Sequence, residues 1–98
     1  MKVQFILTAL QHCSYCDEAG KYFNIKLSKK YPGVGFSILT LSDEKVDEII
    51  KEMPKTVFPI LSVHTGEGKY VDEISGVLYK KDIEAFVEKW VNKSKEDN

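Results

Sequence analysis

The sequence lacks the features that several protein classes need. Among its 98 residues there are only two cysteines and two histidines. A framework of several disulfides is therefore excluded, and His12 and His64 do not form the usual second ligand pair of a zinc site. The longest apolar stretches, such as residues 57–63, are far shorter than a membrane span. The net charge of −1 gives no excess of one sign that would indicate a nucleic-acid or membrane partner.

The composition is that of an ordinary globular protein, 43% hydrophobic and 30% charged. The length predicts one domain, which we assign to residues 1–92, followed by a polar tail at 93–98. The apolar N-terminal segment superficially resembles a signal peptide, but no small-residue cleavage site follows it. We therefore expect a cytoplasmic protein, and we expect it to be a monomer without nucleic-acid or membrane partners.

Periodic patterns of apolar residues predict elements in the order βαβαββα. Strands are predicted over residues 3–9, 34–41, 59–64 and 69–74, and the second of them is predicted to be mostly buried. Helices are predicted from Ser14 to Tyr31, from Ser42 to Pro54, and between Gly76 and the tail. Right-handed crossovers make the first two strands parallel, and the final hairpin adds an antiparallel pair. The prediction is an α/β fold with a four-stranded mixed sheet flanked by helices.

The stretch Cys13-Ser14-Tyr15-Cys16 is the clearest functional motif in the sequence. It lies where the first predicted strand ends and the first predicted helix begins. A helix N-terminus stabilises a thiolate, which is the nucleophile of thiol–disulfide exchange. A purely structural disulfide is disfavoured, because closing so small a loop gains little chain entropy. The sequence therefore predicts a redox-active disulfide between Cys13 and Cys16.

The order of strand, CxxC, helix and proline-led hairpin resembles the thioredoxin fold over the whole chain. In size and motif the chain resembles small glutaredoxins and the phage-type glutaredoxin-like thioredoxins. Cys13-Ser14-Tyr15-Cys16 is similar to the glutaredoxin C-P-Y-C motif, and residues 16–19 are similar to the continuation in the phage type. Thr56-Val57-Phe58-Pro59 resembles the segment with the family's cis-proline, and residues 76–83 resemble the thioredoxin ending. These motifs are specific for the superfamily and not for one branch.

The resemblance implies a thiol–disulfide oxidoreductase active in electron transport, with Cys13 as nucleophile and Cys16 as resolving thiol. The residues that it assigns to substrate binding are Tyr15, Val57, Phe58, Pro59 and Gly76. His12 and Ser14 are expected to modulate the reactivity of the cysteines.

Simpler interpretations stay open for several of these residues. Pro59 could be an edge residue without a cis bond, and Gly76 could serve a tight turn that only glycine fits. Tyr15 could only cover the turn, and His12 could be a solvated side chain.

The resemblance also implies partners. The substrate would be a disulfide-containing protein, with ribonucleotide reductase as the usual client of the phage type, and the electron donor would be thioredoxin reductase or glutathione. Glutaredoxins usually hold glutathione through a lysine shortly before the first cysteine and an acidic turn before the last helix. Residues 10–12 and 75–78 contain neither feature. The buried aspartate of thioredoxins is also missing, since Leu7 occupies its place.

A different class of function is an iron–sulfur carrier that uses Cys13 and glutathione. A C-S-Y-C site resembles glutaredoxins that bridge a cluster between two monomers. The weak glutathione pocket argues against this alternative, and we expect no cofactor bound to the protein. A third interpretation is a redox-inactive structural module.

Overall fold

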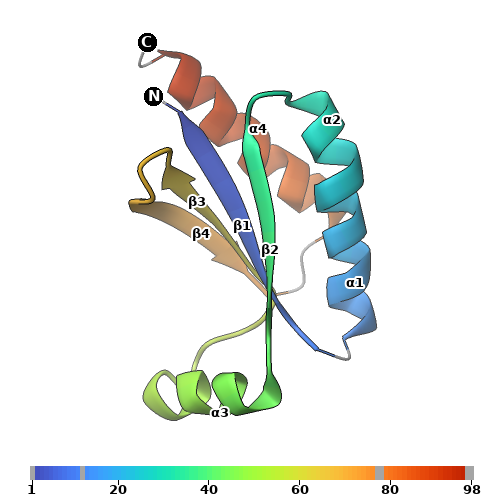
Figure 1. The fold of residues 1–98 in the computed structure, drawn as a ribbon, viewed down its shortest axis with the longest axis vertical. Coiled ribbons are helices and arrows are strands. Elements are labelled where there is room, and N and C mark those ends of the chain that lie inside the picture. The colour runs from blue at the N-terminus through green and yellow to red at the C-terminus, as the bar shows by residue number, and fades with distance from the viewer. Residues whose placement is uncertain (1, 12, 77–78, 97–98) are drawn as a thin grey trace.

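The computed structural model describes residues 2–11, 13–76 and 79–96, and of Tyr15 only the backbone. The elements are β1 (Val3–Leu10), α1 (Ser14–Lys21), η1 (Tyr22–Leu27), α2 (Ser28–Lys30), β2 (Gly35–Leu41), α3 (Asp43–Glu52), β3 (Ile60–Thr65), β4 (Tyr70–Ser75) and α4 (Lys80–Glu96) (Figure 1). The predicted order is confirmed. The first predicted helix consists of three contiguous segments, of which η1 is π-helical.

The strands form the predicted four-stranded mixed sheet, in the order β2-β1-β3-β4. Strand β1 is parallel to β2 and antiparallel to β3, and β3 is antiparallel to β4. The register pairs Leu10 with Leu41 on one side of β1, and Thr8 with Ile60 on the other. The ends of these segments therefore meet at one end of the sheet, where β1 leads into the cysteines.

The core lies on one face of the sheet, beneath α1, η1 and α4. Alternate residues of β1 are buried there, and Phe5 and Leu7 are completely inaccessible to solvent. The ring of Phe36 stacks on Phe5 with centroids 5.6 Å apart and meets the edge of Phe23 at 5.1 Å. The buried positions of α4 are those expected of one helix face: Ile83, Phe86, Val87 and Val91.

The prediction that the second strand is mostly buried is wrong. Strand β2 is at the edge of the sheet, and Ile38 and Leu39 are 39% and 51% exposed. Figure 1 places α3 beyond the end of the sheet and not over its second face. The apolar residues of β2 therefore have a neighbouring strand on one side only, and α3 itself has no buried residue.

Helix α4 continues to Glu96, so residues 93–96 are helical where the sequence predicted a polar tail. Ser94 is buried, and its hydroxyl donates a 2.7 Å hydrogen bond to the carbonyl oxygen of Val91. Packing of this last turn extends the helix beyond its apolar stripe. Among the described residues, no helix is both long enough and apolar enough to cross a membrane.

Candidate active site

Cys13 occupies the N-cap of α1. Its backbone is extended, with φ −116° and ψ 102°, and its Sγ accepts a 3.2 Å hydrogen bond from the N–H of Cys16. Its carbonyl oxygen accepts the bond of the first helical turn from the N–H of Asp17, at 3.0 Å. The sulfur thus takes the place of the oxygen that usually caps a helix, where the dipole favours negative charge. Because Cys13 is partly exposed, this sulfur can meet another molecule.

Cys16 is in a different environment, one turn into the same helix. It is only 2% exposed and begins the buried stripe that continues with Ala19, Phe23 and Leu27. Burial raises the pKa of the Cys16 thiol, and its hydrogen bond with Cys13 raises it further. Both thiols are free. One helix turn therefore presents an accessible sulfur and a buried one.

The peptide bond between Phe58 and Pro59 is cis, in agreement with the family resemblance. Pro59 is fully buried, Phe58 is partly buried, and Val57 is 53% exposed. The carbonyl oxygen of Pro59 accepts a 3.1 Å hydrogen bond from the N–H of Gly76. This bond ties the loop before β3 to the residue that follows β4.

Gly76 has φ +98°, a conformation that residues with a side chain rarely adopt. A Cβ built there would lie 3.8 Å from Cγ1 of Val57, which is an ordinary contact. The turn therefore requires glycine because of its backbone and not because of crowding. This supports the simpler interpretation of Gly76, and its role in substrate binding stays a prediction.

The register of the sheet brings these segments to one end of the molecule. Residue 11 follows the end of β1, α3 begins beside it after Leu41, and the cis-proline loop enters β3 on the other side (Figure 1). Ser14 is exposed as the first residue of α1. His12 and the side chain of Tyr15 lie outside the described residues, so their roles stay predictions.

Sequence reasoning missed two features of the structure. One is a groove beside the cis-proline loop that is lined in part by Met53 and Val57; the only signal for it was an apolar residue at the end of a helix. The other joins η1 and α2 to α4: Glu84 accepts a hydrogen bond from the hydroxyl of Tyr22 at 2.8 Å and forms an ion pair with Lys30. No local pattern connects residues so far apart in the sequence.

No protein-family model matches the sequence, and no curated protein matches it. The structure is similar to solved thioredoxins. Thioredoxin f from spinach chloroplast gives a TM-score of 0.63 at 27% identity, over 86% of this chain and 72% of that one. Oxidised thioredoxin from Plasmodium falciparum gives a TM-score of 0.63 at 20% identity, over 91% of this chain and 81% of that one. The complex of ferredoxin:thioredoxin reductase with thioredoxin f2 gives a TM-score of 0.68 at 23% identity, over 89% of this chain and 76% of that one.

These likenesses confirm the predicted fold and the predicted superfamily. They do not single out the glutaredoxin branch, because the solved structures named above are described as thioredoxins. Together with Cys13 and Cys16 at the start of α1, they support a protein of the thiol–disulfide oxidoreductase type.

Proposed function

We propose that this chain, which has the thioredoxin fold, reduces disulfides in other proteins through Cys13 and Cys16. The observation that carries the proposal is the difference between the two sulfurs. Cys13 is partly exposed at the helix N-cap and accepts the N–H of Cys16, whereas Cys16 is buried. An accessible nucleophile beside a protected second thiol is what a two-step exchange needs.

In the first step, the thiolate of Cys13 attacks one sulfur of the substrate disulfide. A bond forms between the two sulfurs, and the electron pair of the broken substrate bond leaves on the second substrate sulfur, which takes up a proton. In the second step, Cys16 loses its proton and attacks Sγ of Cys13. The mixed disulfide breaks, the first substrate sulfur leaves as a thiol, and Cys13 and Cys16 are joined. Two electrons have then passed to the substrate.

We assign an extended part of the substrate to the loop that holds Val57, Phe58 and Pro59. The family resemblance supports this assignment, and so does the bond from Gly76 to Pro59, which fixes the loop beside the end of β4. Residues with a fixed backbone lose little entropy when a partner binds.

For the electron donor we propose a protein reductase in preference to glutathione. The lysine and the acidic turn that anchor glutathione in glutaredoxins are missing from the sequence. The complex of ferredoxin:thioredoxin reductase with thioredoxin f2, to which this chain is similar in structure, supports this choice of donor. Ribonucleotide reductase is the client that we would test first, and we assign the activity to the reducing cytoplasm.

The proposal is tested by trapping the intermediate. Cys16→Ser should stop after the first step and accumulate a mixed disulfide, which mass spectrometry detects as the added mass of a substrate and a reductant removes. Cys13→Ser should lose activity to the uncatalysed background. The combination Cys13→Ser with Ser28→Cys is the matched control, because it keeps two thiols but moves one to an exposed position on α2. Full reduction of a protein disulfide by Cys13→Ser would end the proposal.

A further inference from the structure

An open groove lies beside the cis-proline loop, between the segment that follows α3 and the second face of the sheet. Its lining includes the apolar residues Met53, Val57 and Ile60 and the charged residues Lys55 and Glu73. Met53 and Val57 are 58% and 53% exposed, so apolar surface is left open to solvent there. Apolar surface that is exposed in one place and bordered by polar residues is typical of a protein-binding site.

The groove borders the candidate active site. Val57 lines the groove, and its Cγ1 would lie 3.8 Å from a Cβ built on Gly76, whose N–H donates a hydrogen bond to the carbonyl oxygen of Pro59. On the other side, α3 begins two residues after Leu41, which pairs with Leu10 shortly before Cys13. A protein that presents a disulfide to Cys13 can therefore place the adjoining segment of its chain in the groove.

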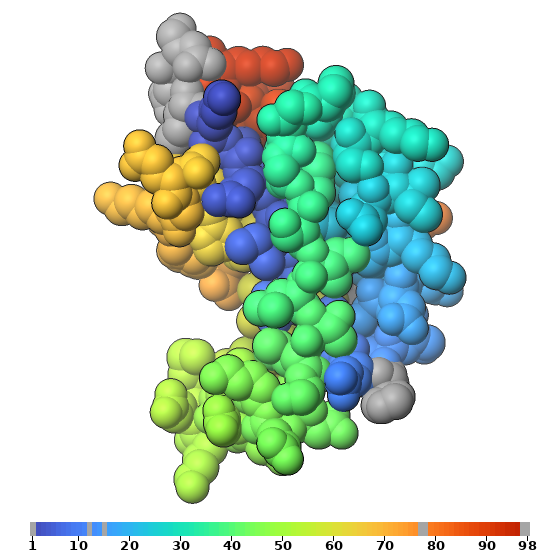
Figure 2. All heavy atoms as spheres, in the orientation of Figure 1, coloured from blue at the N-terminus to red at the C-terminus, as the bar shows by residue number. Residues whose placement is uncertain are grey.

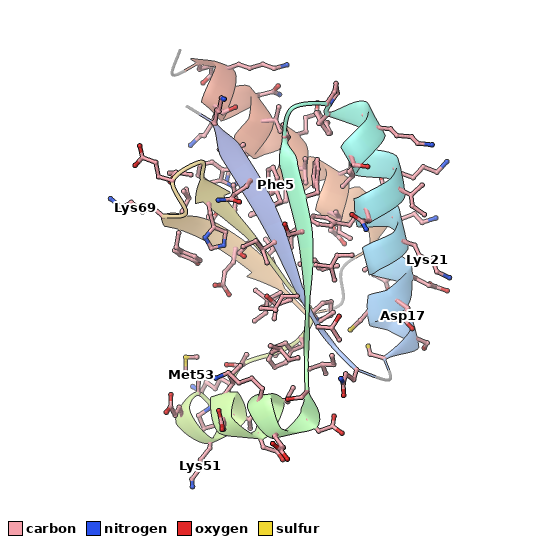
Figure 3. All side chains as sticks on the ribbon, in the orientation of Figure 1. Phe5, Asp17, Lys21, Lys51, Met53 and Lys69 are labelled. Atoms are coloured by element: carbon pink, nitrogen blue, oxygen red, sulfur yellow. The ribbon has the colours of Figure 1, made fainter. Side chains whose placement is uncertain are left out.

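The two charged residues that line the groove, Lys55 and Glu73, are opposite in sign, so the net charge beside it comes from helix α3. Between Asp43 and Glu52 there are five acidic residues and two lysines, a net charge of −3 in a chain whose total is −1. All of these charged residues are exposed, and among the described residues the only ion pair on α3 joins Lys45 to Glu48 at 3.4 Å. The helix projects from the end of the molecule (Figure 2), and at its end the side chains of Met53 and Lys51 lie on opposite sides (Figure 3). The negative charge of the molecule is thus concentrated beside the groove.

The charge distribution indicates what kind of chain segment the groove can bind. A second copy of the chain would bring one acidic helix close to another if the two copies met symmetrically, and like charges repel. A segment with lysine or arginine side chains and some apolar residues matches both the helix and the groove.

We propose that the groove binds the chain segment next to the substrate's disulfide, and that α3 favours substrates in which this segment is basic. The inference rests on the proposed function, because it names the class of substrate for the same site. Attraction by α3 would act mainly on the rate of association.

The test uses two synthetic peptides of the same length and apolar content, one with four arginines and one with four glutamates. Each has a single cysteine linked by a disulfide to thionitrobenzoate, whose release is followed by absorbance. Pre-reduced protein is mixed with each peptide, so that no reductase is needed. At low ionic strength we expect the basic peptide to react about tenfold faster than the acidic one. The ratio should approach one in high salt, because salt screens exposed charges.

Two variants locate the effect. The double substitution Asp47→Asn with Glu52→Gln should lower the ratio from about tenfold to about threefold, because two of the exposed charges are gone. Its matched control is Glu67→Gln with Glu96→Gln, which makes the same change of net charge on the β3–β4 turn and on α4.

Met53→Gln should slow both peptides about fivefold by removing apolar contact. Its control is Ile25→Gln on η1, which alters a residue of similar exposure, 53%, on the other side of the sheet.

The outcomes separate this inference from the function beneath it. Equal rates for the two peptides, or a ratio that the double variant leaves unchanged, would overturn the inference while leaving the oxidoreductase activity intact. Release of thionitrobenzoate from neither peptide would overturn both. A dimer in sedimentation that Met53→Gln dissociates would also overturn the inference, since a second copy would then occupy the groove.

Discussion

The backbone N–H of Cys16 donates a 3.2 Å hydrogen bond to Sγ of Cys13, so each cysteine shapes the environment of the other. The bond places a donor at the sulfur that can reach solvent. Closing the same turn of α1 takes the side chain of Cys16 into the core, where it is 2% exposed. The two thiols therefore differ in their access to solvent although they lie within one turn of the same helix, and their roles follow from this difference.

The first prediction concerns the pH dependence of Cys16. Burial raises its pKa, so the thiol needs a higher pH to ionise in the folded protein than in the unfolded chain. In Cys13→Ser, alkylation of Cys16 by iodoacetamide should be slow at neutral pH and should accelerate only at clearly alkaline pH. The reaction is followed by mass spectrometry, and the same variant in denaturant is the control, because the shift disappears on unfolding. Equal rates in the two states would contradict the burial of this sulfur.

The second prediction concerns Glu84. Its pKa is lowered, first by the hydrogen bond from Lys30 and then by that from Tyr22. A carboxylate with a lowered folded pKa contributes stability above its unfolded pKa, and the contribution is lost as the pH falls through the folded value. Glu84→Gln should therefore lower the urea midpoint at neutral pH, and the difference from the unmodified protein should shrink below the ordinary pKa of a glutamate. Glu96→Gln, near the end of the same helix, should show a smaller difference at neutral pH.

The third prediction concerns the turn at Gly76. Gly76→Ala should destabilise the protein by about 1–2 kcal/mol, because a residue with a Cβ is strained at positive φ. The contact with Val57 leaves room for the methyl group, so crowding adds little. Gly76→Asn should cost less, since asparagine tolerates positive φ better than alanine. Urea unfolding measures both variants, and an unchanged midpoint for Gly76→Ala would show that the backbone is free to adopt another conformation.

The fourth prediction concerns glutathione. We expect it to reduce the Cys13–Cys16 disulfide slowly and with weak saturation, because charge-assisted anchors of about 1.5–3 kcal/mol each are missing. Gln11→Lys supplies a cation shortly before Cys13 and should improve saturation by about tenfold or more. Gln11→Met, of similar length and without charge, is the control. Saturation of the unmodified protein at micromolar glutathione would show that other side chains supply the anchors.

Local signals in the sequence predicted much of the fold and of the site. The cap at Ser42 accepts the N–H of Lys45 at 3.3 Å, and the hairpin closes with a 2.8 Å bond from Gly68 to Thr65. Cys13 at a helix start and the cis bond before Pro59 follow from short motifs. Each of these depends on a few consecutive residues, which is why it could be predicted.

The errors have a common physical cause. The exposure of β2 and the position of α3 depend on how separate elements pack, and an amphipathic pattern does not say whether a partner covers it. The bond from Tyr22 to Glu84 joins residues 62 positions apart. The π-helical turn of η1 has no sequence signature that we could identify. The groove beside Val57 is lined by the segment after α3 and by residues of β3 and β4, and no local pattern joins these elements.

The central position of β1 has a consequence for synthesis on the ribosome. The unit formed by β1, α1 and β2 is complete once Leu41 has left the exit tunnel, so the edge of β1 that pairs with β2 can form its hydrogen bonds early. The other edge of β1 stays unpaired until β3, which begins at Ile60, has been made. During that interval the nascent chain exposes an unpaired strand edge of apolar composition, which is the kind of surface that chaperones protect from aggregation. The N-terminal strand is therefore the first part of the sheet to be made, although one of its edges stays unpaired until β3 has been made.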